Sequence, residues 1–223
     1  KEYETYYGYP EDDIISVTVA GEGASGYRVS GMTEPALKYL LYYSVKMFFD
    51  NGGGQCYIIS VGTYQTTPAI DLRGDQSSNV ATMYGLQDGL DALKLEDEPT
   101  LIVIPEAVQL SSSDYTTLVQ AVLDQCNRLR DRFAVFDIYD GKERLDEVPS
   151  NATESRMVTN RGYFGNNYLK YGAAYYPFIK TTMNYYLKDD ESNVNVTLGS
   201  NPAAALNTFK TTNTTLYNFV KSA

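Results

Sequence analysis

Three acidic side chains stand where an α/β protein could use them for chemistry. Asp137 closes an apolar run, Asp140 follows three residues later, and Glu106 closes the preceding apolar run. Because acidic ligands often sit at strand ends in α/β enzymes, these three carboxylates could together bind a divalent cation. Alternatively they cap loops and face solvent, and we favour this second interpretation.

The other residues that most hydrolytic or metal-dependent chemistry needs are scarce. The chain has no His, so the usual base for a Ser or Cys nucleophile is missing, and its two cysteines are too few for an ordinary zinc site. Cys56 lies in a strand-like run and Cys126 in a helical pattern, which fits free buried thiols, although a single bridge stays possible. We expect no enzyme, no cofactor and no metal site.

The glycine-rich segment at 51–54 could be mistaken for a phosphate-binding loop. It follows a helical pattern and precedes a strand-like one, whereas a phosphate loop needs a strand first and a helix second. A second polar stretch, with Asp124, Arg128 and the arginines of 130–132, has the pattern of a solvated helix end supported by ion pairs. Neither segment predicts a ligand.

Charge and hydropathy narrow the possible partners. The net charge of −10 disfavours nucleic acid, because binding phosphates needs clustered Lys and Arg. No apolar run is long enough to span a membrane, and no signal peptide follows Lys1. The same charge permits a basic protein partner or simply keeps the chain soluble, and we favour solubility. The 21 tyrosines suit large contact surfaces.

Apolar strand-like runs alternate with amphipathic helical patterns through the middle of the chain. Strands buried on both faces produce such runs, so the fold class is α/β, with a central mainly parallel or mixed sheet, helices on both faces and a β-rich appendage. We expect helices over about 34–50, 80–95 and 111–130, the last with a capping box of Ser111 and Asp114, and strands at 56–62, 100–105, 133–138 and 171–179.

Both flanks of this core look different. We expect a loop over 1–13, a hairpin of 14–20 with 27–30, a polar loop over 140–162, a strand at 194–198 within a hairpin, and a final helix over 213–222. The organisation is then an N-terminal loop and β-hairpin at 1–32, an α/β core at 33–180, and a β-hairpin with a short helix at 181–223.

One family resembles this chain in several motifs that follow the same order. The segment at 40–62 reads LLYYSVKMFFDNGGGQCYIISVG, and contractile tail sheath proteins have a helix that ends in Phe-Phe-x-Asn-Gly-Gly before a strand. The matching positions are Phe48, Phe49, Asn51, Gly52 and Gly53. We expect a packed aromatic pair to anchor the helix end while the glycines reverse the chain. Weaker similarity extends from TYYGYP at 5–10 through EDEPTLIVIPE at 96–106 and RLRDRFAVFDI at 128–138 to SRMVTN at 155–160 and KYGAAYYPFIK at 170–180.

This resemblance implies a structural role and no catalytic residues. Sheath subunits of phage tails, and of related contractile injection and type VI secretion-like machines, self-assemble into a helical polymer around an inner tube. They then contract to drive the tube through a target envelope. The implied partners are other sheath subunits and, through a C-terminal domain that this sequence lacks, the inner tube protein. The implied location is the bacterial cytoplasm during assembly and then the virion tail or injection particle.

Two other functions stay open at this point. The first is a metal-dependent enzyme that uses the acidic residues at the C-terminal edge of the sheet, with Glu106, Asp137 and Asp140 as ligands. The second is a secreted tyrosine-rich binding module. Metal titration and glycan or peptide arrays would distinguish them from a sheath subunit.

Overall fold

The computed structural model describes residues 2–8, 10, 15–21, 26–33, 39–64, 70–75, 84–183 and 194–222. The chain divides into two compact units, and we describe each by itself. The first comprises Lys1–Lys38, Tyr64–Pro68 and Asn184–Ala223, and the second comprises Tyr39–Thr63 and Ala69–Met183. One sheet is mixed and the other is all parallel, so the α/β class expected from the sequence is confirmed.

The first unit is built from both ends of the chain. Strand β1 pairs antiparallel with β2 as the expected hairpin and parallel with β6, while β6 pairs antiparallel with β7. The elements are α1 (Glu2–Tyr7), β1 (Ile15–Ala20), β2 (Arg28–Thr33), β6 (Val194–Leu198), β7 (Ala204–Ala205), η5 (Leu206–Thr208), α6 (Phe209–Thr212) and α7 (Thr214–Ser222).

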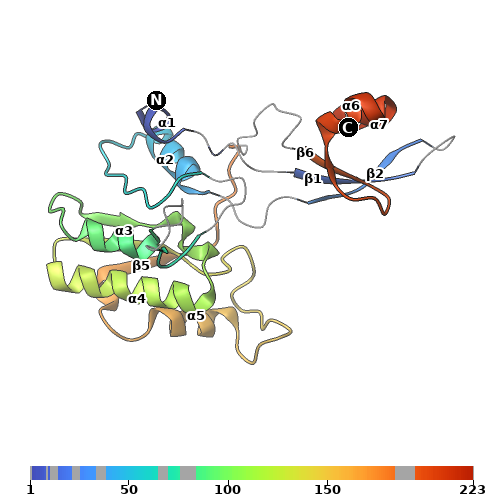
Figure 1. Cartoon of the computed structure of the whole chain (residues 1–223). Helices are drawn as coiled ribbons and strands as arrows, with labels where there is room; N and C mark the ends of the chain where they lie inside the picture. Colours follow the sequence, from blue (N-terminus) through green and yellow to red (C-terminus); the bar gives the residue numbers. More distant parts are fainter. Residues whose placement is uncertain are drawn as a thin grey trace. The chain divides into compact units, whose positions relative to one another are not determined.

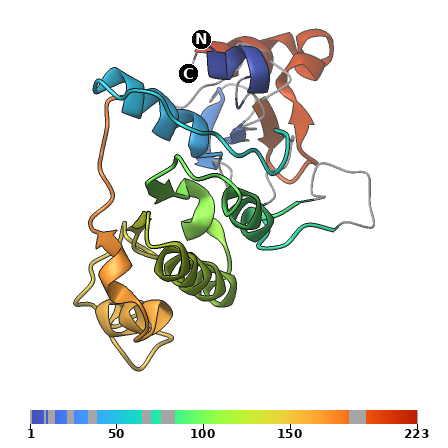
Figure 2. The ribbon, with the colours of Figure 1, turned by 90° about the vertical axis from the view of Figure 1, so that its left-hand side faces the viewer.

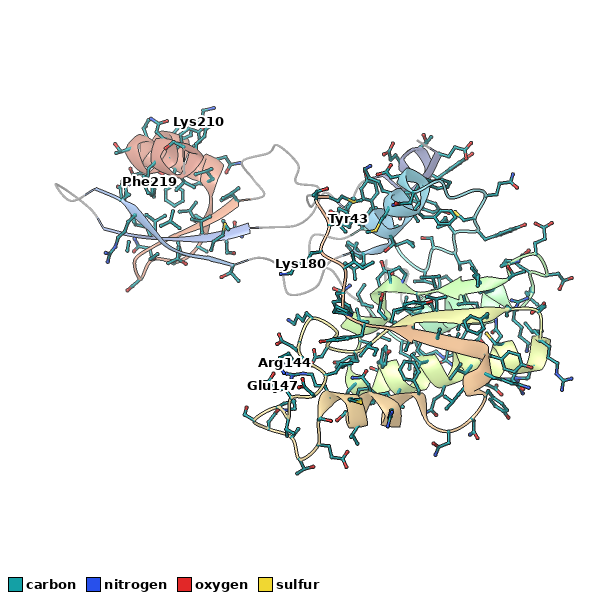
Figure 3. The ribbon with its side chains drawn as sticks, turned by 180° about the vertical axis from the view of Figure 1, so that it is seen from behind. Tyr43, Arg144, Glu147, Lys180, Lys210 and Phe219 are labelled. Carbon is teal, nitrogen blue, oxygen red and sulfur yellow. The ribbon has the colours of Figure 1, made fainter. Side chains whose placement is uncertain are left out.

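Helix α7 closes the core of the first unit, as its apolar stripe predicts. Leu216 is fully buried with Val19 and Val196 of the sheet. Phe219, labelled in Figure 3, lies 5.9 Å from the ring of Tyr27 between ring centroids. The segments expected separately at 1–32 and 181–223 thus share one hydrophobic core.

The second unit holds the parallel sheet in the order β3-β4-β5, and its core lies between this sheet and α4 (Figure 1). Its elements are α2 (Leu41–Asp50), α3 (Leu86–Leu93), β3 (Leu101–Val103), η2 (Pro105–Gln109), α4 (Ser112–Leu129), β4 (Phe133–Asp137), α5 (Arg156–Phe164), η3 (Leu169–Tyr171) and β5 (Gly172–Tyr175).

Helix α4 follows the sequence prediction closely. The Ser111 hydroxyl accepts a hydrogen bond from the Asp114 amide at 3.2 Å, which satisfies one free N–H of the first turn. Leu118, Val122 and Cys126 repeat at helical spacing and are fully buried. Gly172 of β5 lies under this helix, because a Cβ there would come within 2.8 Å of the Leu123 side chain.

Four expected elements differ from the structure. The strand expected at 171–179 is shorter, because β5 ends at Tyr175. The stretch at 56–62 is not a strand: Cys56 is exposed, and Ile59 and Val61 pack beside Gly89 of α3 instead of joining the sheet. The expected loop over 1–13 contains the short helix α1, which has acidic residues in its first turn. The expected loop over 140–162 contains the start of α5. The buried Asn160 side chain of this helix accepts a hydrogen bond from the Tyr139 amide and donates one to the Tyr139 carbonyl.

Two expected helices lie partly outside the described residues. Of the helix expected over 34–50, the structure has 41–50 as α2, and 34–38 lie outside the described part. Of that expected over 80–95, it has 86–93 as α3, and 80–83 lie outside. No helix within the described ranges is long and apolar enough to cross a membrane.

The parallel sheet is covered on one face and open on the other. Ile102, Ala134 and Phe136 point to the buried side, where α3, α4 and α5 pack. On the opposite side, Leu101 is 61% exposed and Val103 is 56% exposed. The sequence predicts helices on both faces, but among the described residues those packed on the sheet leave this second face open.

Candidate functional site: the end of helix α2 and the acidic strand ends

The residues that resemble the sheath motif form a helix stop at the end of α2. The Gly53 amide donates to the Phe48 carbonyl at 2.8 Å, and the Gly52 amide donates to the Phe49 carbonyl at 3.0 Å. Gly52 has a φ of 86°, which a residue with a side chain adopts only with strain. This pair of hydrogen bonds is a Schellman motif, so Asn51, Gly52 and Gly53 satisfy carbonyls that the helix leaves free.

The two aromatic residues of the motif lie on the surface. Phe48 is 45% exposed and Phe49 is 49% exposed, and their ring centroids are 5.3 Å apart. The expectation of a buried aromatic anchor is therefore wrong. The Phe48 ring instead lies over the Cα of Gly53, because any Cβ at that position would collide with it. The motif holds two neighbouring rings outward at the end of a rigid helix.

Glu106 tethers the other end of α2. Its carboxylate Oε1 accepts a hydrogen bond from the Leu41 amide at 2.7 Å, and the side chain is buried. Burial raises the pKa of Glu106, while the backbone amide of Leu41 acts in the opposite direction. A carboxylate held in this way supports a helix N-terminus and is not placed to bind a cation beside Asp137.

The other two acidic candidates do not join Glu106. Asp137 is exposed at the end of β4, although surrounding protein desolvates its carboxylate enough to raise its pKa. Asp140 has a φ of 56° and lies 3.9 Å from the Arg156 guanidinium. Across the described ranges, no three His, Cys, Asp or Glu side chains gather in a way that could hold a metal ion.

Arg132 is a residue that sequence reasoning misplaced. It was expected on a solvated face, but its side chain is fully buried. Its guanidinium donates to the Leu93 carbonyl at 3.1 Å and to the Glu96 carbonyl at 2.8 Å, and it pairs with Asp131. Arg132 therefore joins the end of α3 to the start of β4. The sequence feature that could have indicated burial is the position of Arg132 directly before the apolar strand β4.

Apolar side chains also reach the surface from the last residue of β5 onward. Tyr175, Tyr176, Phe178 and Ile179 are all exposed along one short segment. Contiguous exposed apolar surface on a folded protein marks interaction sites more often than scattered single residues do. Together with Phe48 and Phe49, this segment gives the second unit two apolar surface features.

One cavity of about 230 Å³ lies where α4 meets the end of α5. Gln120, Asp124, Phe164 and Tyr168 line it. The Gln120 side-chain amide already donates to the Tyr163 carbonyl at 3.0 Å, and Asp124 is paired with Arg128. These two polar side chains are thus engaged within the protein, and the lining does not predict a particular ligand.

Comparisons with known proteins add no assignment to these observations. No family model matches the sequence, and no curated protein matches it.

Proposed function

We propose that this chain is the α/β core of a contractile tail sheath subunit. In this role, copies of the protein stack around an inner tube and move together to a contracted state that drives the tube forward. The proposal rests on the ordered motifs of the sequence and on how the second unit presents the residues of one of them.

The exposed Phe48 and Phe49 pair is the observation that carries the proposal. Two adjacent aromatic rings lie about half in solvent. A protein that acts alone thereby loses part of the stabilisation of about 1.5–3 kcal/mol that full burial of each such side chain would give. The Schellman motif fixes both rings relative to the end of α2. A surface that is both apolar and rigid fits repeated contact between subunits.

The acidic strand ends lend no support to the metal-dependent alternative. The Glu106 carboxylate is used by the backbone of α2, and Asp140 lies nearest a cation, Arg156. An assembly that stores energy in subunit contacts needs no catalytic group, since it moves between two arrangements of the same surfaces.

Electron microscopy tests the proposal directly. The full-length sheath subunit that contains this core, co-expressed with an inner tube protein, should form tubes with a helical surface lattice. Replacing both rings, in Phe48→Ser with Phe49→Ser, should abolish the lattice and leave the circular dichroism spectrum unchanged. The control is Tyr84→Ser, which removes an aromatic residue of similar exposure outside the motif. Uniform small particles and bare tubes from the unaltered protein would contradict the proposal.

A further inference from the structure

The open face of the parallel sheet is apolar and only partly covered: Leu101 and Val103 are exposed, and Phe133 and Val135 are half-buried. Strand register sets Leu101 beside Phe133 and Val103 beside Val135 on this face. On the neighbouring strand, Tyr175 lies beside Asp137, the one charged residue at its margin. Parallel sheets normally have both faces covered, because their strands consist mainly of apolar residues. Something must therefore cover this face in the working protein.

The dimensions of the face fit one helix. Three strands about 4.8 Å apart, with the longest about 17 Å in length, give a surface roughly 10–15 Å wide. A stable contact between two protein chains buries about 800 Å² on each side, which is several times larger. A helix about 10 Å across and about 15 Å long, the length of ten residues, matches it.

Helix α2 has that length and a matching apolar stripe. At 100° per residue, Leu41, Val45, Phe48 and Phe49 fall within one arc of the helix. Lys46 and Asp50 pair with each other outside this arc, where they would remain in water. The stripe itself carries no charged residue.

Helix α2 lies on the side of the sheet away from α4. In Figure 2, α4 lies on one side of the strands and α2 on the other, as it also does in Figure 1. Glu106 lies three residues after the end of β3, and its hydrogen bond to Leu41 holds the first residue of α2 at that point. At the other end, Ile59 packs on the core, and the intervening residues 51–58 could span about 26 Å if extended.

We propose that α2 closes over the open face of the sheet, turning about the Glu106–Leu41 contact so that Val45 and Phe48 pack against Val103 and Val135. The closed state hides Phe48, and the open state presents it to a partner. This inference does not require the sheath role, since it concerns how the second unit completes its own core. A second copy of the chain covering the same face is the competing outcome.

Disulfide trapping distinguishes these outcomes. In a Cys56→Ser background, which removes the exposed thiol, Val45→Cys is combined with Val103→Cys under mild oxidation. We expect an intramolecular crosslink to form at least ten times faster than in the matched pair Tyr43→Cys with Val103→Cys. Tyr43, labelled in Figure 3, lies about 160° around the helix from Val45. Equal rates, or crosslinking only between chains, would overturn the proposal.

A fluorescence measurement tests the same closure if oxidation disturbs the fold. The chain contains no Trp, so Val103→Trp introduces a single reporter on the open face. Closure predicts that adding Phe48→Asp will raise acrylamide quenching of this reporter at least two-fold, whereas Lys46→Asp will not. Equal quenching in all three proteins would show that α2 does not cover the face.

Discussion

Gly52 carries the backbone conformation that ends α2. Its φ of 86° lies in the left-handed region, where a side chain costs about 1–2 kcal/mol. We therefore expect Gly52→Ala to lower the free energy of unfolding by about that amount. Gly54→Ala is the control, because a Cβ there meets nothing within 4 Å and the residue has no positive φ. Urea denaturation measures both, and equal losses would show that the helix stop does not depend on Gly52.

Arg132 gives a second prediction at this scale. Its buried guanidinium donates to the carbonyls of Leu93 and Glu96, so truncation leaves both carbonyls without this donor. We expect Arg132→Ala to cost about 1–3 kcal/mol, the range for leaving a buried acceptor without its hydrogen bond. Arg128→Ala, at an exposed pair on α4, should cost less than about 1 kcal/mol. Chemical denaturation that found similar costs for the two would contradict the buried role of Arg132.

Glu106 makes stability depend on pH. Burial raises its pKa above the usual value of 4.5, so the folded chain binds this proton more tightly than the unfolded chain does. The stabilisation from the protonated form is complete below about 4.5 and is lost as the pH rises through the raised pKa. Glu106→Gln keeps an acceptor for the Leu41 amide and removes the titration.

The measurement is the free energy of unfolding of both proteins between pH 4 and pH 8. We expect the unaltered protein to lose stability relative to Glu106→Gln as the pH rises across this window. The exposed Glu143→Gln should follow the unaltered protein throughout. A constant difference between the unaltered protein and Glu106→Gln would show that Glu106 has the same pKa folded and unfolded.

Elements with strong local signals were predictable from the sequence. Helix α4 combines a cap at Ser111 with a buried stripe, and β4 is a short apolar run, so both appear where expected. Helix α5 was missed because it is fixed by tertiary contacts: Asn160 bonds the backbone of Tyr139, and the helix has a weak apolar stripe. Periodicity cannot detect such a contact.

The stretch at 56–62 shows the opposite failure. Its apolar residues resemble a buried strand, but their backbone joins no sheet. Their side chains pack against α3 instead, where Gly89 leaves room for Val61. Short apolar runs do not distinguish a paired strand from an extended segment lying on a helix. For the candidate site, the sequence placed the motif at the helix end. It could not show that Phe48 and Phe49 point outward, because exposure depends on the rest of the fold.

At the scale of the whole molecule, the two units have separate cores made from different parts of the chain. Parallel pairing sets Ile15 of β1 opposite Val194 of β6, across most of the sequence. No local pattern specifies such a pairing, so the sequence alone predicts the two ends as separate segments. Their shared core, with Val19, Val196 and Leu216, assigns them to one unit.

Separate cores predict separate unfolding. Leu216 is fully buried in the first unit and Leu118 in the second, so each Leu→Ala change should cost its own unit about 2–5 kcal/mol. Native-state hydrogen exchange, read by mass spectrometry on peptides from β6 and from α4, measures the two units in one sample. We expect Leu216→Ala to speed exchange in β6 alone and Leu118→Ala to speed it in α4 alone. Each variant is the control for the other, since they remove the same atoms from equally buried sites. If either change sped exchange in both peptides alike, the chain would unfold as one cooperative body, and the division into two units would have no energetic meaning.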